Sequence, residues 1–292
     1  MKLATIRTAE GDRLVAVDEA QGQAWPIVSA PGLTNPSLLD LVKLNTDLAA
    51  LVRAERPLAL SEVTFAAPIP RPPRNIFCVG KNYYEHAKEF TASGYDSSAK
   101  SAADAVPDFP IVFSKVPECV IGHQDAIRFP EGVSDSVDYE AELAVIIGRG
   151  GRGISKAQAM SHVWGYSIIN DMTARDLQGR HKQWLIGKSL DTFGPMGPVA
   201  VTADEVDAGN MGIRCWVNDE LRQDSNTRDL IFDIPTLIES ISAGITLYPG
   251  DIIATGTPAG VGIGFTPPKF LQRGDRVTVE IDGVGRLTNT LT

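Results

Sequence analysis

The fold is decided by the stretch Asp138-Tyr139-Glu140-Ala141-Glu142-Leu143-Ala144-Val145-Ile146-Ile147-Gly148. Its residues alternate with the two-residue period of a β-strand. One face carries Val137, Tyr139, Ala141, Leu143, Val145 and Ile147, and the other carries Asp138, Glu140 and Glu142. A strand this apolar should be buried, and neighbouring buried carboxylates repel one another unless a positive group lies between them. A divalent cation is the simplest such group, so the stretch predicts a metal-dependent enzyme.

A third acid follows another strand-like run, in Ile168-Ile169-Asn170-Asp171. Together Glu140, Glu142 and Asp171 would offer three hard oxygen ligands. Such ligands suit Mg²⁺, Mn²⁺ or Ca²⁺ better than zinc, which prefers His and Cys. Considered alone, Glu140 and Glu142 fit equally well as two solvated acids on an edge strand.

Composition narrows the class of protein. With 292 residues, the chain predicts one large domain and a smaller appendage. Its net charge of −9 argues against a nucleic-acid or anionic-membrane partner. Cys78, Cys119 and Cys215 lack CxxC spacing and indicate free thiols in a reducing cytosol. Because Met1-Lys2-Leu3-Ala4-Thr5-Ile6-Arg7 lacks an apolar signal segment and no apolar run is long enough to span a membrane, we expect a cytoplasmic protein.

A proline-rich segment, Pro68-Ile69-Pro70-Arg71-Pro72-Pro73, cannot be helical and predicts a stiff linker. We therefore expect a small N-terminal α+β domain over residues 1–70 and a larger domain over residues 71–292. The N-terminal domain should hold strands near 2–7, 13–17 and 24–28. It should also hold a helix that begins at Asn35-Pro36 and carries an apolar stripe as far as Val52.

The larger domain should be rich in strands. These are expected at residues 76–79, 111–114, 137–147, 164–170, 213–217, 251–255, 277–281 and 285–290, with helices at 156–163 and 234–243. Many strands and few helices predict a mostly antiparallel core, closer to a rolled barrel or sandwich than to a doubly wound sheet. The sequence has neither a GxGxxG fingerprint nor a P-loop, so nucleotide binding has no support.

Several residues outside the acidic set could carry chemistry. His86 and Glu89 would face each other on a short helix after Gly80. A carboxylate beside an imidazole raises the basicity of the ring, so the pair could act as a general base. Taken alone, the pair fits an ordinary ion pair on a helix surface better. Lys188, in an apolar setting, could stabilise developing negative charge. Residues 91–108 are small and polar, which is typical of a mobile active-site cover.

Six segments in order resemble the fumarylacetoacetate hydrolase family, from about Arg74 to the C-terminus. They are Val79-Gly80-Lys81-Asn82-Tyr83-Tyr84-Glu85-His86, Asp138-Tyr139-Glu140-Ala141-Glu142-Leu143, Asn170-Asp171-Met172-Thr173-Ala174-Arg175-Asp176-Leu177-Gln178, Gly187-Lys188-Ser189, Arg222-Gln223-Asp224-Ser225-Asn226-Thr227 and Pro249-Gly250-Asp251-Ile252-Ile253-Ala254-Thr255-Gly256-Thr257-Pro258. Each segment alone is a weak indication of the family, but six segments in the same order are a very specific one. The resemblance implies an α+β, mostly β fold: a mixed β-roll catalytic domain with a small N-terminal domain, usually assembled as a homodimer.

The resemblance also implies roles for individual residues. Glu140, Glu142 and Asp171 match the ligands of Mg²⁺ or Mn²⁺, which Ca²⁺ can replace in crystals, and the founding hydrolases' further aspartate ligand has no clear match here. His86 and Glu89 match the pair that activates water. The remaining matches are Lys188, which assists catalysis, and Gln178 and Thr257, which contact substrate; Arg175 and Tyr83 are assigned to substrate binding as well.

These features predict a hydrolase that cleaves a C–C bond in a small acylpyruvate-like or 2,4-dioxo acid through a metal-stabilised enolate, with a place in aromatic compound catabolism. The same enolate would support an isomerase, a hydratase or a decarboxylase acting on a 2-oxo acid or a 2-hydroxydienoic acid. A catalytically silent metal-binding protein is the alternative from another class. Retention of the three acids, the His86–Glu89 pair and Lys188 argues against it.

Overall fold

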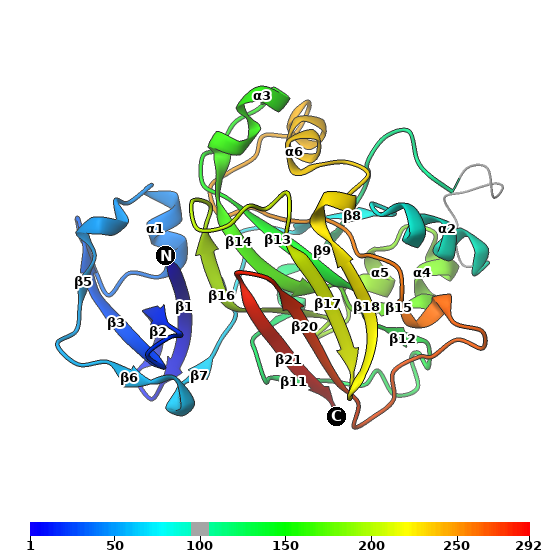
Figure 1. Ribbon diagram of the computed structural model, residues 1–292, viewed down its shortest axis with the longest axis horizontal. Helices are drawn as coiled ribbons and strands as arrows, with labels where there is room; N and C mark the ends of the chain where they lie inside the picture. The colour runs from blue at the N-terminus through cyan, green and yellow to red at the C-terminus, as the bar shows by residue number, and fades with distance from the viewer. Residues whose placement is uncertain (95–104) are drawn as a thin grey trace.

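The larger of two main β-sheets runs across the whole protein (Figure 1). The computed structural model describes residues 1–94 and 105–292. The strands follow the order β4 (Leu33–Thr34), β3 (Gln23–Ala30), β2 (Gly11–Asp18), β1 (Lys2–Thr8), β16 (Gly194–Thr202), β14 (Val163–Asn170), β13 (Ala141–Ile147), β19 (Ile252–Ala254), β8 (Ile76–Gly80) and β9 (Ile111–Lys115). Short strands β5 (Val52–Arg53), β6 (Leu58–Ala59), β7 (Thr64–Phe65) and β10 (Val120–Ile121) pair beside this path. Most neighbours are antiparallel, but β19 and β8 are parallel, so the sheet is mixed.

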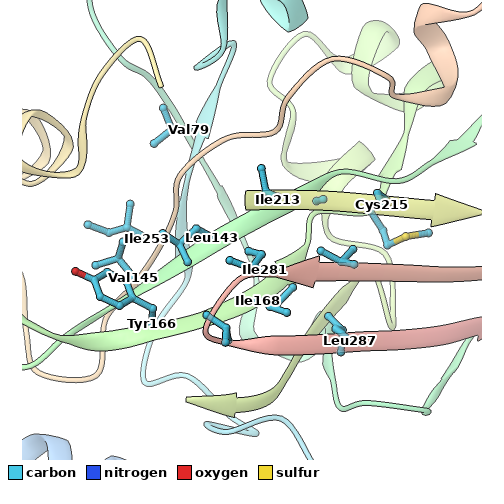
Figure 2. Packing of buried hydrophobic residues seen from close by; sticks show 14 of the residues in the cluster. Val79, Leu143, Val145, Tyr166, Ile168, Ile213, Cys215, Ile253, Ile281 and Leu287 are labelled. Atoms are coloured by element: carbon cyan, nitrogen blue, oxygen red, sulfur yellow. The ribbon is translucent and has the colours of Figure 1, made fainter. Parts of the chain in front are cut away.

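The second main sheet packs on the larger one and closes the core. Its order is β11 (Ala126–Ile127), β21 (Gly285–Leu291), β20 (Arg276–Ile281), β17 (Gly212–Val217) and β18 (Glu220–Asn226), and β12 (Val137–Asp138) pairs separately with β15 (Thr173–Ala174). Figure 2 shows Leu143 and Ile168 of the larger sheet beside Ile281 of the second. The inward residues of both sheets are almost fully buried, and this apolar burial is the main source of stability.

Six α-helices cover the ends and edges of the sheets in the described residues. They are α1 (Leu38–Lys43), α2 (Tyr84–Ala92), α3 (Lys156–Ala159), α4 (Arg175–His181), α5 (Leu185–Lys188) and α6 (Ile234–Ser242). Helices α2, α4 and α5 gather at one side of the protein, on the right in Figure 1. The predicted α+β, mostly β fold is confirmed. No helix in the described part of the chain is long and apolar enough to cross a membrane.

The N-terminal strands join the larger sheet directly. Strand β1 pairs antiparallel with β16, in a register that sets Lys2 opposite Val201 and Leu3 opposite Ala200. One hydrophobic cluster contains both Leu3 and Met196, on either side of the expected boundary near residue 70. The division into residues 1–70 and 71–292 stays a prediction, but hydrogen bonds and core packing run across it.

The helix expected from Asn35-Pro36 to Val52 begins later and ends earlier. Its N-cap is Ser37, whose hydroxyl accepts from the Asp40 N–H while the Asp40 carboxylate accepts from the Ser37 N–H. This reciprocal capping box satisfies two otherwise unpaired N–H groups, and it overrides the Asn-Pro signal. Asn35 instead has φ 47, and Asn45 has the same φ just beyond the helix. The apolar stripe therefore continues only as a 3₁₀ turn at Leu48–Ala50.

The strand expected over residues 137–147 is interrupted at Tyr139 and Glu140, between β12 and β13. Here the backbone bonds to side chains instead of a neighbouring strand: the Glu140 N–H donates to Asn170 Oδ1 at 3.0 Å and the Ala141 N–H donates to Gln223 Oε1 at 3.0 Å. The Glu140 carbonyl accepts from the Asp171 N–H at 2.9 Å. The interruption therefore brings Glu140 next to Asp171.

Candidate active site

A cavity lies where helices α2, α4 and α5 meet the interrupted strand. The lining residues are Val79, Gly80, Lys81, His86, Phe90, Phe113, Glu140, Glu142, Arg175, Gln178, Trp184, Lys188 and Thr257. Most of the polar side chains among them are almost fully buried. The electrostatic interactions in this cavity are therefore poorly screened by water.

The predicted acidic triad comes together at this cavity. Glu140, Glu142 and Asp171 each offer a carboxylate oxygen, and these oxygens all lie within 4.8 Å of one another. All three side chains are buried. Glu142 belongs to β13, Glu140 comes just before this strand, and Asp171 comes just after β14. The pairing of Ala141 with Asn170 brings these two segments side by side. The sequence-based grouping of these three acids is reproduced by the geometry.

Buried cations neutralise part of this charge. Lys188 Nζ lies 2.7 Å from both Glu140 Oε2 and Asp171 Oδ2. Lys115 Nζ lies 2.8 Å from Asp171 Oδ1, and Arg175 Nη1 lies 2.7 Å from Glu140 Oε1. Burial alone would lower the pKa of Lys188, but Asp171 and Glu140 outweigh it and raise that pKa. Burial likewise opposes ionisation of Glu140, yet Lys188 and Arg175 lower its pKa.

Glu142 is the carboxylate of the triad that pairs with no cation among the described residues. Its Oε2 accepts a hydrogen bond from the Gly256 N–H at 2.9 Å. Burial, followed by the charges of Asp171 and Glu140, raises the pKa of Glu142 well above its usual range. In addition, Asp171 Oδ1 is buried without a well-formed hydrogen bond, although Lys115 Nζ is near. The uncompensated Glu142 carboxylate, in a set of three oxygen donors, fits a hard divalent cation.

Metal affinity is expected to rise with pH. Below the raised pKa of Glu142 the carboxyl is protonated, so a cation must displace that proton before it can bind. Above that pKa the competition disappears. The Mn²⁺ dissociation constant, measured by calorimetry across pH, should fall about tenfold per pH unit while one proton is released, and then level off. Glu142→Gln should bind weakly without this dependence, and a pH-independent constant in the wild type would contradict the assignment.

His86 and Glu89 form the expected pair on helix α2. His86 Nδ1 lies 3.3 Å from Glu89 Oε2, one turn apart on the helix. His86 lines the cavity, whereas Glu89 lies behind it and is held by the Gly260 N–H, which donates to Oε1 at 3.1 Å and to Oε2 at 3.2 Å. Because Glu89 occupies Nδ1, the other ring nitrogen is left for a bound molecule.

Arg175 is the cavity residue best placed to hold an anion. Asp138 Oδ2 accepts from its Nε at 2.8 Å, and Gln178 Oε1 accepts from its Nη1 at 3.1 Å. Its Nη2 is buried and makes no hydrogen bond within residues 1–94 and 105–292. A buried donor of this kind is costly unless a ligand oxygen satisfies it.

The other residues expected to bind substrate are placed differently. Thr257 lines the cavity, and its Oγ1 accepts from Gln223 Nε2 at 2.8 Å, so its own hydroxyl hydrogen is free to donate. Tyr83 lines a separate cleft with Tyr84 and Asp229, and it is not among the residues around the cavity. Its role in substrate binding stays a prediction. The cover expected over residues 91–108 lies partly outside the described residues, because 95–104 are not described.

Three residues that shape the site were missed or grouped wrongly from the sequence. Lys115, Asp138 and Gln223 are all buried and polar. Lys115 was the easiest to find, because a lysine ending the apolar run Ile111–Lys115 is as unusual as Lys188 in its apolar segment. Asp138 was grouped with the glutamates by periodicity, but it contacts Arg175 instead of joining the triad.

Comparison with known proteins gives consistent matches. A family model described as fumarylacetoacetate (FAA) hydrolase, C-terminal, matches residues 75–292. The oxaloacetate tautomerase YisK of Bacillus subtilis (strain 168) is 45% identical over 296 residues, covering 97% of this chain and 94% of that protein. The fumarylacetoacetate hydrolase of psychrophilic Exiguobacterium antarcticum is 38% identical, with a TM-score of 0.83 over 100% of this chain and 99% of that chain. A maleylpyruvate hydrolase from Sphingobium sp. SYK-6, solved in complex with manganese(II) and pyruvate, is 31% identical, with a TM-score of 0.76 over 100% and 99% of the two chains.

Proposed function

The chain belongs to the fumarylacetoacetate hydrolase family of enzymes, and we propose that it is a divalent-metal-dependent tautomerase of a small 2-oxo dicarboxylate of the oxaloacetate type. Keto–enol tautomerisation is one form of the isomerase chemistry that a metal-stabilised enolate supports. The extent of the similarity to an oxaloacetate tautomerase, 45% over nearly the whole of both chains, favours it over C–C bond hydrolysis.

The observation that carries the proposal is that three kinds of functional group line one cavity. Glu140 and Glu142 line it with carboxylates, His86 with a base, and Arg175 and Lys188 with buried cations. Keto–enol exchange needs a group that moves a proton at carbon and groups that stabilise negative charge on oxygen.

A divalent cation would be held by Glu140, Glu142 and Asp171. When bound, it would polarise the 2-oxo oxygen and stabilise negative charge there. Mg²⁺ or Mn²⁺ suits this all-oxygen set, and the Mn²⁺ complex of the Sphingobium relative supports the choice. The hydrolase of that structure was solved with pyruvate, a 2-oxo acid, which supports the proposed substrate class for this chain.

The chain's own residues would orient the substrate and move the proton. Arg175, fixed by Asp138, binds a carboxylate through its unpaired Nη2, and Thr257 donates to a second oxygen. His86 removes a proton from the carbon beside the 2-oxo group, and the imidazolium gives that proton to the enolate oxygen, so that the keto form becomes the enol; the reverse reaction runs through the same two transfers. Glu89 stabilises the imidazolium that forms. Lys188, kept charged by Asp171 and Glu140, offsets the negative charge that develops on oxygen.

Hydrolysis of an acylpyruvate remains a second candidate because of the His86–Glu89 pair. A base of this kind can activate a water molecule as readily as it can move a proton at carbon. The solved relative from Exiguobacterium is a fumarylacetoacetate hydrolase, which also favours it. The two reactions differ in their products, since tautomerisation breaks no C–C bond.

A product assay with Mg²⁺ should separate these reactions. We expect the ultraviolet absorbance of enol oxaloacetate to decay faster with enzyme than without it, with no change in the total oxaloacetate. Acylpyruvates should yield little pyruvate in a coupled dehydrogenase assay. Rapid formation of pyruvate and a carboxylic acid from acylpyruvates, with enol decay at the uncatalysed rate, would establish hydrolysis instead. The same assay after chelation tests the metal requirement.

A further inference from the structure

A glycine-rich loop, residues 258–264, passes directly behind the acid–base pair. It reads Pro258-Ala259-Gly260-Val261-Gly262-Ile263-Gly264 and follows strand β19. The N–H of Gly260 donates to both carboxylate oxygens of Glu89. At the other end of the loop, a Cβ at position 264 would overlap Oε1, Cδ and Cγ of Glu89. The carboxylate of Glu89 thus occupies the space that a side chain at position 264 would need.

The loop itself cannot move aside easily. The Gly262 N–H donates to Asp138 Oδ1 at 2.7 Å and the Ile263 N–H donates to Asp138 Oδ2 at 3.0 Å. The Pro258 carbonyl accepts from Gln223 Nε2 at 2.8 Å, and the Gly260 carbonyl accepts from the Tyr139 hydroxyl at 2.8 Å. Asp138, Tyr139 and Gln223 are nearly fully buried. Buried anchors of this kind hold a backbone more firmly than rotamer preferences hold one side chain.

The side chain of Glu89, in contrast, lies next to open space into which it can rotate. Its side chain is 17% exposed and borders an open surface cleft that also touches Ala92, Ser93 and Phe265. Rotation about its own bonds would carry the carboxylate from His86 into this cleft and into water. A group at position 264 would therefore displace Glu89 and leave the loop in place.

We propose that Gly264 is a positioning residue, which admits the Glu89 carboxylate to the place where the Gly260 N–H and His86 Nδ1 can both bind it. Gly264 touches no reacting atom and acts through Glu89. Gly260 binds the same carboxylate from the other side. A side chain is excluded at this position too, because the φ of Gly260 is +100 and the Arg222 carbonyl lies where a Cβ would be. The inference rests on the proposed function, because it assigns Glu89 a role in tuning the base.

The test is Gly264→Ala, compared with Glu89→Ala and with the double variant. Gly264→Ala should lower kcat about 10²-fold, the lower end of the range for general acid–base catalysis, with KM and the Mn²⁺ dissociation constant nearly unchanged. In the Glu89→Ala background the space is already vacated, so the same substitution should change kcat by no more than about twofold. Gly244→Ala is the matched control, because a Cβ at Gly244 meets no heavy atom of the described residues within 4 Å.

A crystal structure of Gly264→Ala gives a readout that does not depend on turnover. We expect the Glu89 carboxylate to leave Gly260 and His86 while the loop stays bound to Asp138. A Glu89 that keeps both contacts would overturn the inference, as would an equal loss of kcat in the Glu89→Ala background. If the wild type fails to turn over oxaloacetate but Glu89 is displaced in the variant, the proposed function fails and the positioning role of Gly264 stands.

Discussion

Replacing Asp171 with asparagine is expected to lower turnover by about 10³-fold or more. The bound cation would stabilise the transition state by several kcal/mol, and losing that stabilisation corresponds to a rate loss of this size. Asp171 is fully buried and contacts Lys188 through one oxygen and Lys115 through the other. Asparagine keeps the shape but removes the charge and presents a donor to one of these cations. The triad would also lose one of its three ionic ligands. Stopped-flow enol decay and Mn²⁺ titration should both register the change.

Stability is a necessary control for Asp171→Asn. Removing one partner of a buried ion pair costs about 3–5 kcal/mol of unfolding free energy, so turnover should be compared only where denaturant curves show folded protein. Asp191→Asn is the matched substitution, since its carboxylate is 77% exposed and, among the described residues, contacts only Arg128, at 3.4 Å. It should leave both measurements unchanged. A fully folded Asp171→Asn protein with normal Mn²⁺ affinity would remove Asp171 from the ligand set.

The sequence was informative about the fold wherever periodicity and capping agreed. Helix α6 lies at Ile234–Ser242, and Asp233 caps it by accepting from the Thr236 N–H, as expected from the pattern. The missed strands have clear physical reasons. Strand β16 contains Pro195 and Pro198, which cannot donate to a ladder, and it is accommodated by an irregular register opposite β14. Strand β18 is largely polar and half-exposed, so it carries no apolar alternation.

For the site, the local sequence could predict which residues take part, but it could not predict the contacts between distant segments. Glu140 and Glu142 are two residues apart, so their shared face follows from strand geometry. The contact of Lys115 with Asp171 joins strand β9 to the end of β14, and no motif spans that distance. Likewise, the interruption at Tyr139 and Glu140 depends on Asn170 and Gln223, side chains from other strands. Such contacts appear only once the sheets are packed.

Substituting His86 with alanine is expected to lower turnover by about 10²–10⁴-fold, the usual contribution of a general base. His86 is nearly buried, lines the cavity and pairs with Glu89 at 3.3 Å. It is not one of the three residues that would hold a cation. Mn²⁺ affinity should therefore be nearly intact. Glu89→Gln should cause a smaller loss, because the amide oxygen can still accept one hydrogen bond while its charge is gone. A His86→Ala enzyme with wild-type turnover would exclude the imidazole as the base.

Helix α2 offers an internal control for the pair. Glu85 and Lys88 have the same spacing and are 2.8 Å apart, but their side chains are 74% and 60% exposed. Glu85→Gln should have little effect, because exposed pairs of this kind contribute at most about 1 kcal/mol and touch no reacting group.

The size of the His86→Ala loss also depends on the reaction. Tautomerisation and hydrolysis both need the base, one to move a proton at carbon and the other to activate water, whereas loss of carbon dioxide from a β-keto acid needs neither. Enol decay that collapses in His86→Ala while decarboxylation of oxaloacetate persists would therefore place the imidazole in the proton transfer itself, and equal losses in both would assign it to holding the substrate.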